Sequence, residues 1–233
     1  MFRFLLIVMI LMGTASVAQV TPDKEGFRVT GRVTVQHPRG KHGDNGSVVV
    51  WLTPLEHSLQ VKPADNLRLV QKDKTFEPHL LVVPLGSRVE FPNLDPLFHN
   101  VFSLYEGKRF DLGLYEAGGS RFVNFTRPGV SYIFCNIHPE MSAVVVALPT
   151  PYYAVTNGMG EYAISGVEPG AYEMKFWYER AAPEDLAKLS HRITVTGSTT
   201  LEPMRIAETK PAFEHKNKYG QDYDVNPPYE PGR

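Results

Sequence analysis

Short apolar runs that end at glycine or proline are the feature of this sequence that most limits its fold. The chain of 233 residues contains 19 glycines and 19 prolines. Residues 27–36 alternate apolar and polar side chains, which is the period of a half-buried strand. Residues 182–189 can form a short helix, because Pro183 suits a first turn and acidic residues follow it. The sequence therefore predicts an all-β fold with little helix.

The composition is that of a globular chain with a balanced charge. Apolar residues make up 42% of the chain and charged residues 21%, and the net charge is −1. No run of lysine and arginine has the length of a nucleic-acid patch. We therefore expect no nucleic-acid partner. The chain is long enough for one large domain or two small ones.

The first eighteen residues have the pattern of a secretory signal peptide. Arg3 is the positive residue, residues 4–12 form the apolar core, and Ser16-Val-Ala18 is a small-residue cleavage site. The apolar stretch is short for a membrane span, although a retained anchor is the alternative. We predict a signal peptide over residues 1–18, a periplasmic or secreted protein, and no stable membrane insertion after cleavage.

One short stretch holds three residues that can bind a metal ion. Cys135, the only cysteine, is followed by His138 and Met141 at C-x2-H-x2-M spacing. A thiolate, a thioether and imidazoles are soft or borderline ligands that favour copper over a structural zinc ion. A single free thiol in an oxidising compartment also needs an explanation, and copper ligation supplies one.

The expected strands place these residues on a single loop. Residues 130–134 and 142–148 both read as strands, so the loop joins two strand ends. A further ligand must come from another segment, and His99 is the natural candidate. A lone cysteine or histidine is usually structural, but two His, one Cys and an axial Met form the blue-copper arrangement. The four residues support a copper site only as a set.

At these residues the chain resembles the cupredoxins of the plastocyanin and amicyanin kind. The loop Cys135-Asn-Ile-His-Pro-Glu-Met141 has the short ligand spacing of amicyanin, including the proline after the histidine. His99-Asn100 resembles the His-Asn pair of the family. Residues 83–93 and 128–135 resemble its approaches to the first histidine and to the cysteine. The resemblance covers residues 62–149.

The resemblance implies a Greek-key β-sandwich with one type 1 copper ion. His99, Cys135, His138 and Met141 would be the ligands, and Asn100 would tie the two ligand segments together and tune the Cys135 sulfur. Electrons would pass through the partly exposed His138. An apolar docking rim would surround that histidine, formed by Pro96, Leu97, Phe98, Ile137 and Pro139.

Residues outside this region predict a second small β-sandwich. Residues 152–177 contain short strands with turns at Asn157-Gly158 and Pro169-Gly170, and they resemble the carboxypeptidase-regulatory type of sandwich. We assign residues 27–61 and 150–206 to this outer sandwich, with the cupredoxin region inserted in it or packed beside it. The alternative is that these strands extend the cupredoxin sheets. Residues 207–233 are expected to be a mostly disordered tail, which could dock through Phe213 and Tyr223.

These observations predict a carrier of single electrons between redox protein partners, and not an enzyme. All four ligand positions are filled by the protein, which leaves no position open for a substrate. The chain also lacks the His-x-His pairs of coupled copper clusters. Two alternatives remain: a copper-handling module whose outer sandwich binds a partner or a glycan, and an oxidoreductase with its substrate at copper.

Overall fold

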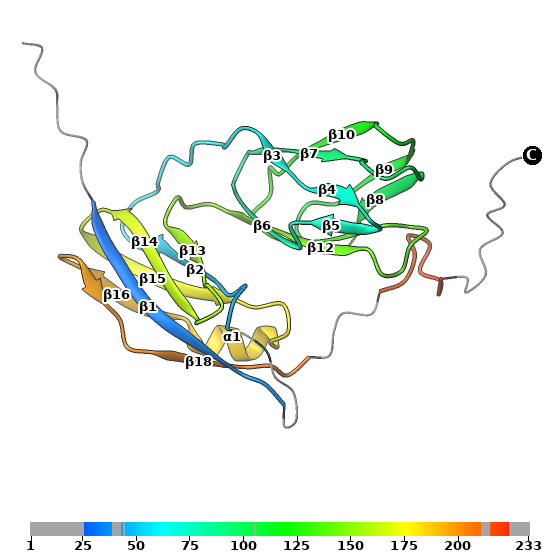
Figure 1. Ribbon diagram of the computed structural model, residues 1–233. Helices are drawn as coiled ribbons and strands as arrows, with labels where there is room; N and C mark the ends of the chain where they lie inside the picture. The colour runs from blue at the N-terminus through cyan, green and yellow to red at the C-terminus, as the bar shows by residue number, and fades with distance from the viewer. Residues whose placement is uncertain (1–25, 39–42, 44, 105, 211–214, 224–233) are drawn as a thin grey trace, which may run out of the picture.

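The regular secondary structure of the described residues is almost entirely short β-strands, as a computed structural model shows (Figure 1). The all-β fold predicted from the sequence is confirmed, with several sheets and one short helix among the described residues. No helix of this part of the chain is long and apolar enough to cross a membrane. The predicted signal peptide, residues 1–18, lies outside the described residues. The structure describes residues 26–38, 43, 45–104, 106–210 and 215–223.

The middle of the chain forms what we call the inner sandwich. Its strands are β3 (Leu67–Arg68), β4 (Val70–Lys72), β5 (Thr75–Glu77), β6 (Leu80–Pro84), β7 (Arg88–Pro92), β8 (His99–Ser103), β9 (Phe110–Tyr115), β10 (Ser120–Asn124), β11 (Gly129–Phe134) and β12 (Ser142–Leu148). One sheet has the order β10-β7-β3 and the other the order β6-β12-β11-β8-β9, while β4 and β5 form a hairpin. The candidate ligands lie in this sandwich, at the start of β8 and between β11 and β12.

The core of the inner sandwich forms because its strands alternate buried and exposed side chains. In β7, Val89 and Phe91 are fully buried whereas Arg88 is exposed. Cys135 and Met141 belong to the same buried cluster as these core residues. Both sulfur atoms of the predicted site are therefore carried by residues that the packing of the sandwich immobilises.

The remaining strands form the outer sandwich and come from both ends of the described chain. They are β1 (Phe27–Gln36), β2 (Val49–Pro54), β13 (Tyr153–Val155), β14 (Glu161–Val167), β15 (Gly170–Trp177), β16 (His191–Val195), β17 (Thr199–Thr200) and β18 (Met204–Ala207). β1 pairs with β14, β17 and β18, while the second sheet has the order β13-β2-β15-β16. The chain therefore leaves this sandwich after β2 and returns to it at β13.

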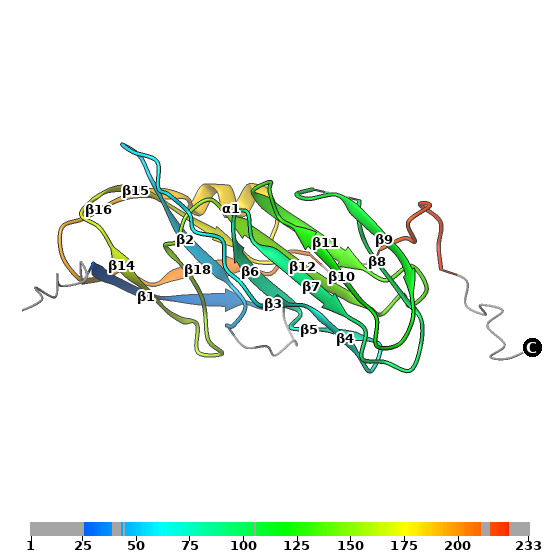
Figure 2. The same ribbon diagram turned by 90° about the horizontal axis from the view of Figure 1, so that it is seen from above.

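A third buried cluster joins the two sandwiches, which lie side by side in Figure 1 and Figure 2. Val144, Val146 and Leu148 of β12 pack there against Val49 of β2. The alternate residues of β12 face the core of the inner sandwich. This explains why β12 is almost continuously apolar, since both of its faces are covered.

The one helix among the described residues, α1 (Pro183–Leu189), confirms the short helix predicted from the sequence. Proline occupies its first turn, where a missing N–H costs nothing. Glu184 and Asp185 lie in the same turn, close to the positive end of the helix dipole. Leu186 is buried against the outer sandwich, so tertiary packing holds a helix too short to be stable alone.

Candidate metal centre

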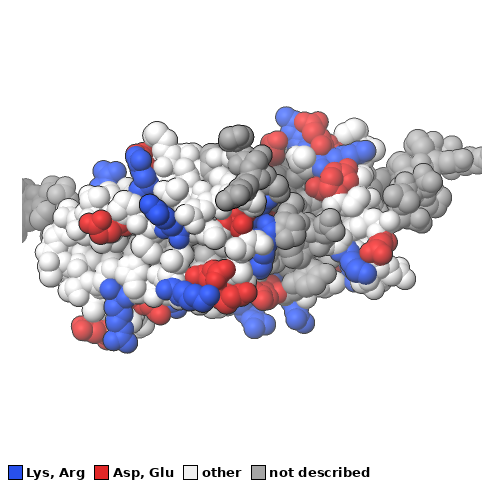
Figure 3. Space-filling model, turned by 90° about the horizontal axis from the view of Figure 1, so that it is seen from below, with Lys and Arg blue, Asp and Glu red and all other residues white. Residues whose placement is uncertain are grey.

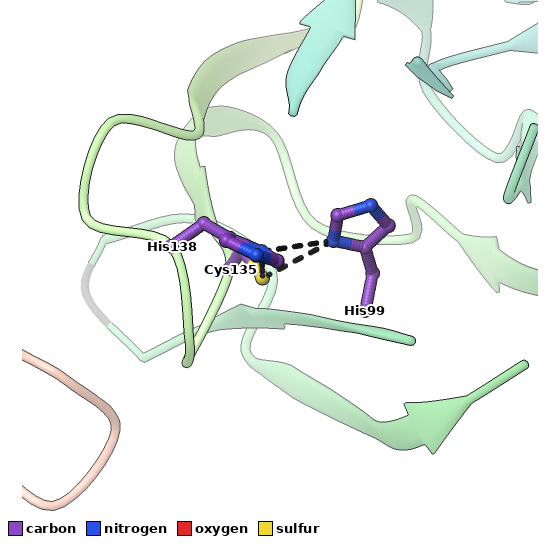
Figure 4. Close-up of side chains that lie close together, drawn as sticks. All are labelled: His99, Cys135 and His138. Carbon is purple, nitrogen blue, oxygen red and sulfur yellow. Dashed lines mark hydrogen bonds between the residues drawn. The ribbon is translucent and has the colours of Figure 1, made fainter. Parts of the chain in front are cut away.

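Three of the predicted ligands converge on one point in the structure (Figure 4). The Nδ1 atoms of His99 and His138 are 3.1 Å apart, and Cys135 Sγ lies 3.8 Å from the first and 3.5 Å from the second. A point equidistant from these three atoms lies about 2.0 Å from each, which is close to the length of a metal–nitrogen bond. The side chains therefore surround a space of the size that one metal ion requires.

The loop before β8, which positions His99, is held by hydrogen bonds from the Asn93 side chain. The side-chain amide of Asn93, fully buried, donates hydrogen bonds to the carbonyls of Leu97 (2.7 Å) and Glu116 (3.1 Å). Its Oδ1 accepts a hydrogen bond from the N–H of Asp95 at 3.1 Å. These bonds satisfy the polar backbone of the loop, so the loop enters β8 with His99 directed into the sandwich.

Asp95 fixes the orientation of the His99 ring. Its Oδ2 lies 2.7 Å from His99 Nε2, and both residues are buried. The carboxylate also accepts hydrogen bonds from the backbone N–H groups of Asp73 (2.6 Å) and Lys74 (3.0 Å) in the β4–β5 turn. Burial alone would raise the pKa of Asp95, but these donors and His99 together lower it. Since Nε2 donates to the carboxylate, Nδ1 presents its lone pair to the site.

The ligand loop, Cys135–Met141, is closed by its own backbone. The N–H of Cys135 donates to the Met141 carbonyl at 3.2 Å, and the N–H of Met141 donates to the His138 carbonyl at 3.1 Å. Met141 is fully buried beside Cys135 in the core cluster. The structure thus brings the methionine to the same end of the sandwich as the other three residues.

The thiol and the second imidazole have shifted pKa values. Burial raises the pKa of Cys135, although the backbone N–H groups of Asn100, Ile137 and His138 oppose this effect. Burial and the neighbouring His99 lower the pKa of His138. His138 is therefore neutral at neutral pH, the form that binds metals, whereas Cys135 must lose its proton when a metal binds.

Asn100 bridges the site and strand β9. Its backbone N–H faces the Cys135 sulfur, while its side-chain amide donates to Asp111 Oδ1 at 2.7 Å. Its Oδ1 is buried and has no hydrogen-bond partner among the described residues. In this structure, therefore, the backbone of Asn100 contacts the ligand loop and its side chain contacts Asp111.

The residues of the predicted docking rim are mostly accessible. Phe98 is 44% exposed and Ile137 39%, Pro96 and Pro139 are exposed, and Leu97 is half-buried. Leu114 of β9, which pairs with Asn100 in register, is 60% exposed. The sequence did not indicate that Leu114 is an exposed apolar residue next to Asn100, because strand alternation alone does not show which face of β9 is covered.

Two charged residues near the site were also missed by the sequence analysis. Asp95 orients His99, and Asp111 contacts Asn100. An acidic residue four positions before a candidate metal-binding histidine is a usable signal, because such ligands usually donate their second nitrogen to a carboxylate or carbonyl. Asp111 offers no comparable signal, since its contact depends on the pairing of β8 with β9.

No known family model and no curated protein matches this chain. Among solved structures, a purple cupredoxin from Nitrosopumilus maritimus is 22% identical, with a TM-score of 0.33, over 36% of this chain and 100% of that one. A reduced amicyanin variant is 22% identical, with a TM-score of 0.34, over 37% of this chain and 92% of that one. A copper-containing nitrite reductase from Thermus scotoductus SA-01 is 21% identical, with a TM-score of 0.35, over 41% of this chain. The chain spans only 25% of that nitrite reductase.

The donor set itself is consistent with a type 1 copper site. Two imidazole nitrogens and one sulfur form the triangle, and a buried methionine lies at the same end of the sandwich. Zinc sites rarely include methionine, whereas a His₂Cys plane with a weak axial Met suits copper. The outer sandwich is present as a second β-domain beside the inner sandwich.

Proposed function

We propose that this protein is an exported type 1 copper protein that carries single electrons between redox partners. The observation that carries the proposal is the triangle of His99 Nδ1, Cys135 Sγ and His138 Nδ1. A copper ion held there would accept and release one electron without binding a substrate. Met141 would be the weak axial ligand.

The protein residues around the site are suited to a rigid ligand set. Asp95 holds His99 through Nε2, so the ring cannot rotate without losing a buried hydrogen bond. Three backbone N–H groups, those of Asn100, Ile137 and His138, surround the Cys135 sulfur and favour its thiolate. A site that keeps its shape in both oxidation states needs little reorganisation, which favours electron transfer over chemistry on a substrate.

We propose that electrons enter and leave through His138. This ring is half-buried, in contrast to the fully buried His99. Phe98, Ile137 and Pro139 are exposed and close in sequence to the two histidines. Small apolar patches of this kind suit the weak, short-lived contacts of redox proteins. We therefore propose a redox protein as the partner at this surface.

The charge distribution supports the proposal that nucleic acid is not a partner. Figure 3 shows Lys and Arg interspersed with Asp and Glu on the face seen from below. The net charge of −1 is far from the positive balance of nucleic-acid-binding domains. Export to the periplasm or the cell exterior is proposed from the pattern of residues 1–18 alone.

A second candidate function is a copper-binding module whose outer sandwich binds a partner or a glycan. An open hollow of about 840 Å³ on that sandwich favours it. Both charged and hydroxyl side chains line the hollow, among them Arg28, Thr30, Arg32, Glu161 and Thr200. Rapid loss of Cu(I) to a chelator would favour this function, whereas reversible redox cycling with retained copper would favour the electron carrier.

Absorption and EPR spectra of the Cu(II)-loaded protein test the proposed function. We expect an intense thiolate-to-copper band that Cys135→Ala abolishes. His99→Ala should open a position to water and change both spectra. Met141→Leu should change both spectra, because it removes the proposed axial ligand. Its matched control, Met159→Leu, at a methionine that is 62% exposed, should leave the spectra unchanged. A blue band that survives Cys135→Ala would show that the ligand set is wrong.

A further inference from the structure

The segment 215–223, which follows the outer sandwich in the chain, lies against the ligand loop of the inner sandwich. Figure 1 and Figure 2 show the orange-red end of the described chain beside the tips of β8 and β12. The sequence predicts that this segment belongs to a mostly disordered tail that could dock through Phe213 and Tyr223. The structure shows the segment ordered and docked through Tyr223, whereas Phe213 lies outside the described residues. It has few apolar side chains, so hydrogen bonds and ring contacts hold it.

The segment is shaped by a turn that Asn217 closes. Asn217 Oδ1 accepts hydrogen bonds from the N–H groups of Tyr219 and Gln221, both at 3.0 Å. The backbone N–H of Asn217 donates to the Gln221 carbonyl at 2.9 Å. Gly220 adopts φ +76°, a conformation that favours glycine. The turn reverses the chain, so His215 and Tyr223 lie next to each other with ring centroids 5.2 Å apart.

Both of these rings contact the backbone of the ligand loop. His215 Nε2 donates to the Pro139 carbonyl at 2.9 Å, and the His215 ring stacks on Phe134 with centroids 3.9 Å apart. The Tyr223 hydroxyl donates to the Cys135 carbonyl at 2.6 Å. The two aromatic residues thus hold the loop beside the thiol ligand and beside His138.

A further pair of contacts extends this attachment to the first ligand segment. The N–H of Lys218 donates to Asn136 Oδ1 at 2.9 Å, and Lys218 Nζ lies 2.8 Å from Asp111 Oδ2. The other oxygen of Asp111 accepts from Asn100, the residue after His99. The segment therefore links the ligand loop to the strand that carries the first histidine. Ile137 remains exposed, so the contacts leave the proposed docking side accessible.

We propose that residues 215–223 form a strap that locks the ligand loop, and that His215 and Tyr223 are positioning residues for the metal centre. The strap adds three hydrogen bonds to a loop that otherwise closes through its own backbone, at Cys135, Asn136 and Pro139, and one ring stack on the adjoining Phe134. Its effect on copper rests on the proposed function, whereas its effect on loop motion does not. The outer sandwich then has a definite role, because it anchors the chain that leads to the strap.

Hydrogen–deuterium exchange of the metal-free, full-length protein tests the strap. Tyr223→Phe removes only the hydroxyl, which bonds the Cys135 carbonyl and lies 3.1 Å from His215 Nδ1. The double variant Tyr223→Phe/His215→Ala also removes the stack and the Pro139 contact. We expect backbone exchange in residues 135–141 to accelerate by about fivefold in the first variant and more in the second. Gln221→Ala, at an exposed side chain of the same segment, should change nothing.

Unchanged exchange in both variants would overturn the proposal. Acceleration that extends equally to β14 in the outer sandwich would also overturn it, because it would show global destabilisation.

In Cu(II)-loaded protein the same variants should release copper to a chelator several-fold faster and shift the EPR hyperfine coupling. Copper release and EPR parameters identical to those of the unmodified protein would overturn the positioning role. Failure of every variant, and of the unmodified protein, to bind copper would contradict the proposed function, while the exchange experiment would still decide whether the strap exists.

Discussion

The two segments that meet at the candidate metal centre are held by different parts of the molecule. His99 is fixed from within the inner sandwich, by Asp95 only four residues earlier in the chain. The ligand loop is fixed from outside, by Tyr223, which is 88 residues from Cys135. A second outside contact runs from Glu179 through His79 to the carbonyl of Ser142, the residue after Met141.

This difference shows that the two ligand segments of one centre can be held in different ways. His99 is held by neighbouring residues of the inner sandwich, whereas the ligand loop is also held by a segment distant in sequence. The contacts that hold His99 all come from the inner sandwich. Asn93 holds the loop before β8, Asp95 orients the His99 ring, and the backbone of the β4–β5 turn holds the Asp95 carboxylate. The ligand loop closes its own backbone and is held further by the strap, residues 215–223, which follows the outer sandwich in the chain. We therefore expect substitutions of the residues that hold His99 to change the metal site directly. Substitutions of the residues that contact the ligand loop from outside should act by increasing the motion of that loop.

Asp95→Ala should have the largest effect, because it leaves the buried Nε2–H of His99 without a partner. We expect a stability loss of roughly 1–3 kcal/mol and a loss of copper affinity of about 10- to 100-fold. Urea unfolding of the metal-free protein and competition with a chelator measure the two effects. The exposed Asp65 provides the control, Asp65→Ala. Unfolding and copper affinity equal to those of the control would refute the orienting role of Asp95.

The Asp111–Lys218 pair should have a smaller effect, because both side chains are partly exposed (21% for Lys218 and 35% for Asp111). A double-mutant cycle of Asp111→Ala and Lys218→Ala should give a coupling free energy of about 0.2–1 kcal/mol. The coupling should decline as salt is added, because the pair is accessible to counterions. Zero coupling at low salt would show that this ion pair does not link the strap to strand β9.

The smallest effect should come from the titration of His79, which is expected to make the free energy of unfolding depend on pH. The hydrogen bond to Glu179 raises the pKa of His79, burial opposes this, and the Ser142 carbonyl assists it. Because the folded pKa is above the ordinary value of 6.5, the stabilisation is complete below that pH and is lost as the pH rises through the raised value. The side chain is about half exposed, so we expect less than about 1 kcal/mol.

Urea midpoints at acidic and alkaline pH measure this dependence. Glu179→Gln should reduce the difference between the two midpoints, while Glu56→Gln, at an exposed glutamate, should leave it unchanged. An undiminished difference in Glu179→Gln would show that His79 does not link the sandwiches in solution.

Much of the fold and the centre of the site could be predicted from the sequence. Strand alternation and the Gly and Pro turns predict the all-β fold, and the position of Pro183 predicts the start of α1. The spacing of Cys135, His138 and Met141 places them on one loop between two strands. These features depend on residues near each other in the chain, where local preferences and short spacings act directly.

Only the tertiary structure decided how the centre is held. The contact of Tyr223 with Cys135 and that of His215 with Pro139 span 88 and 76 residues. The partnership of His79 with Glu179 spans 100 residues and crosses from one sandwich to the other. Such contacts depend on how the sheets pair and pack together, which no local pattern of side chains encodes. The sequence by itself thus determined which residues could bind a metal, whereas the packing of the two sandwiches determined what surrounds them.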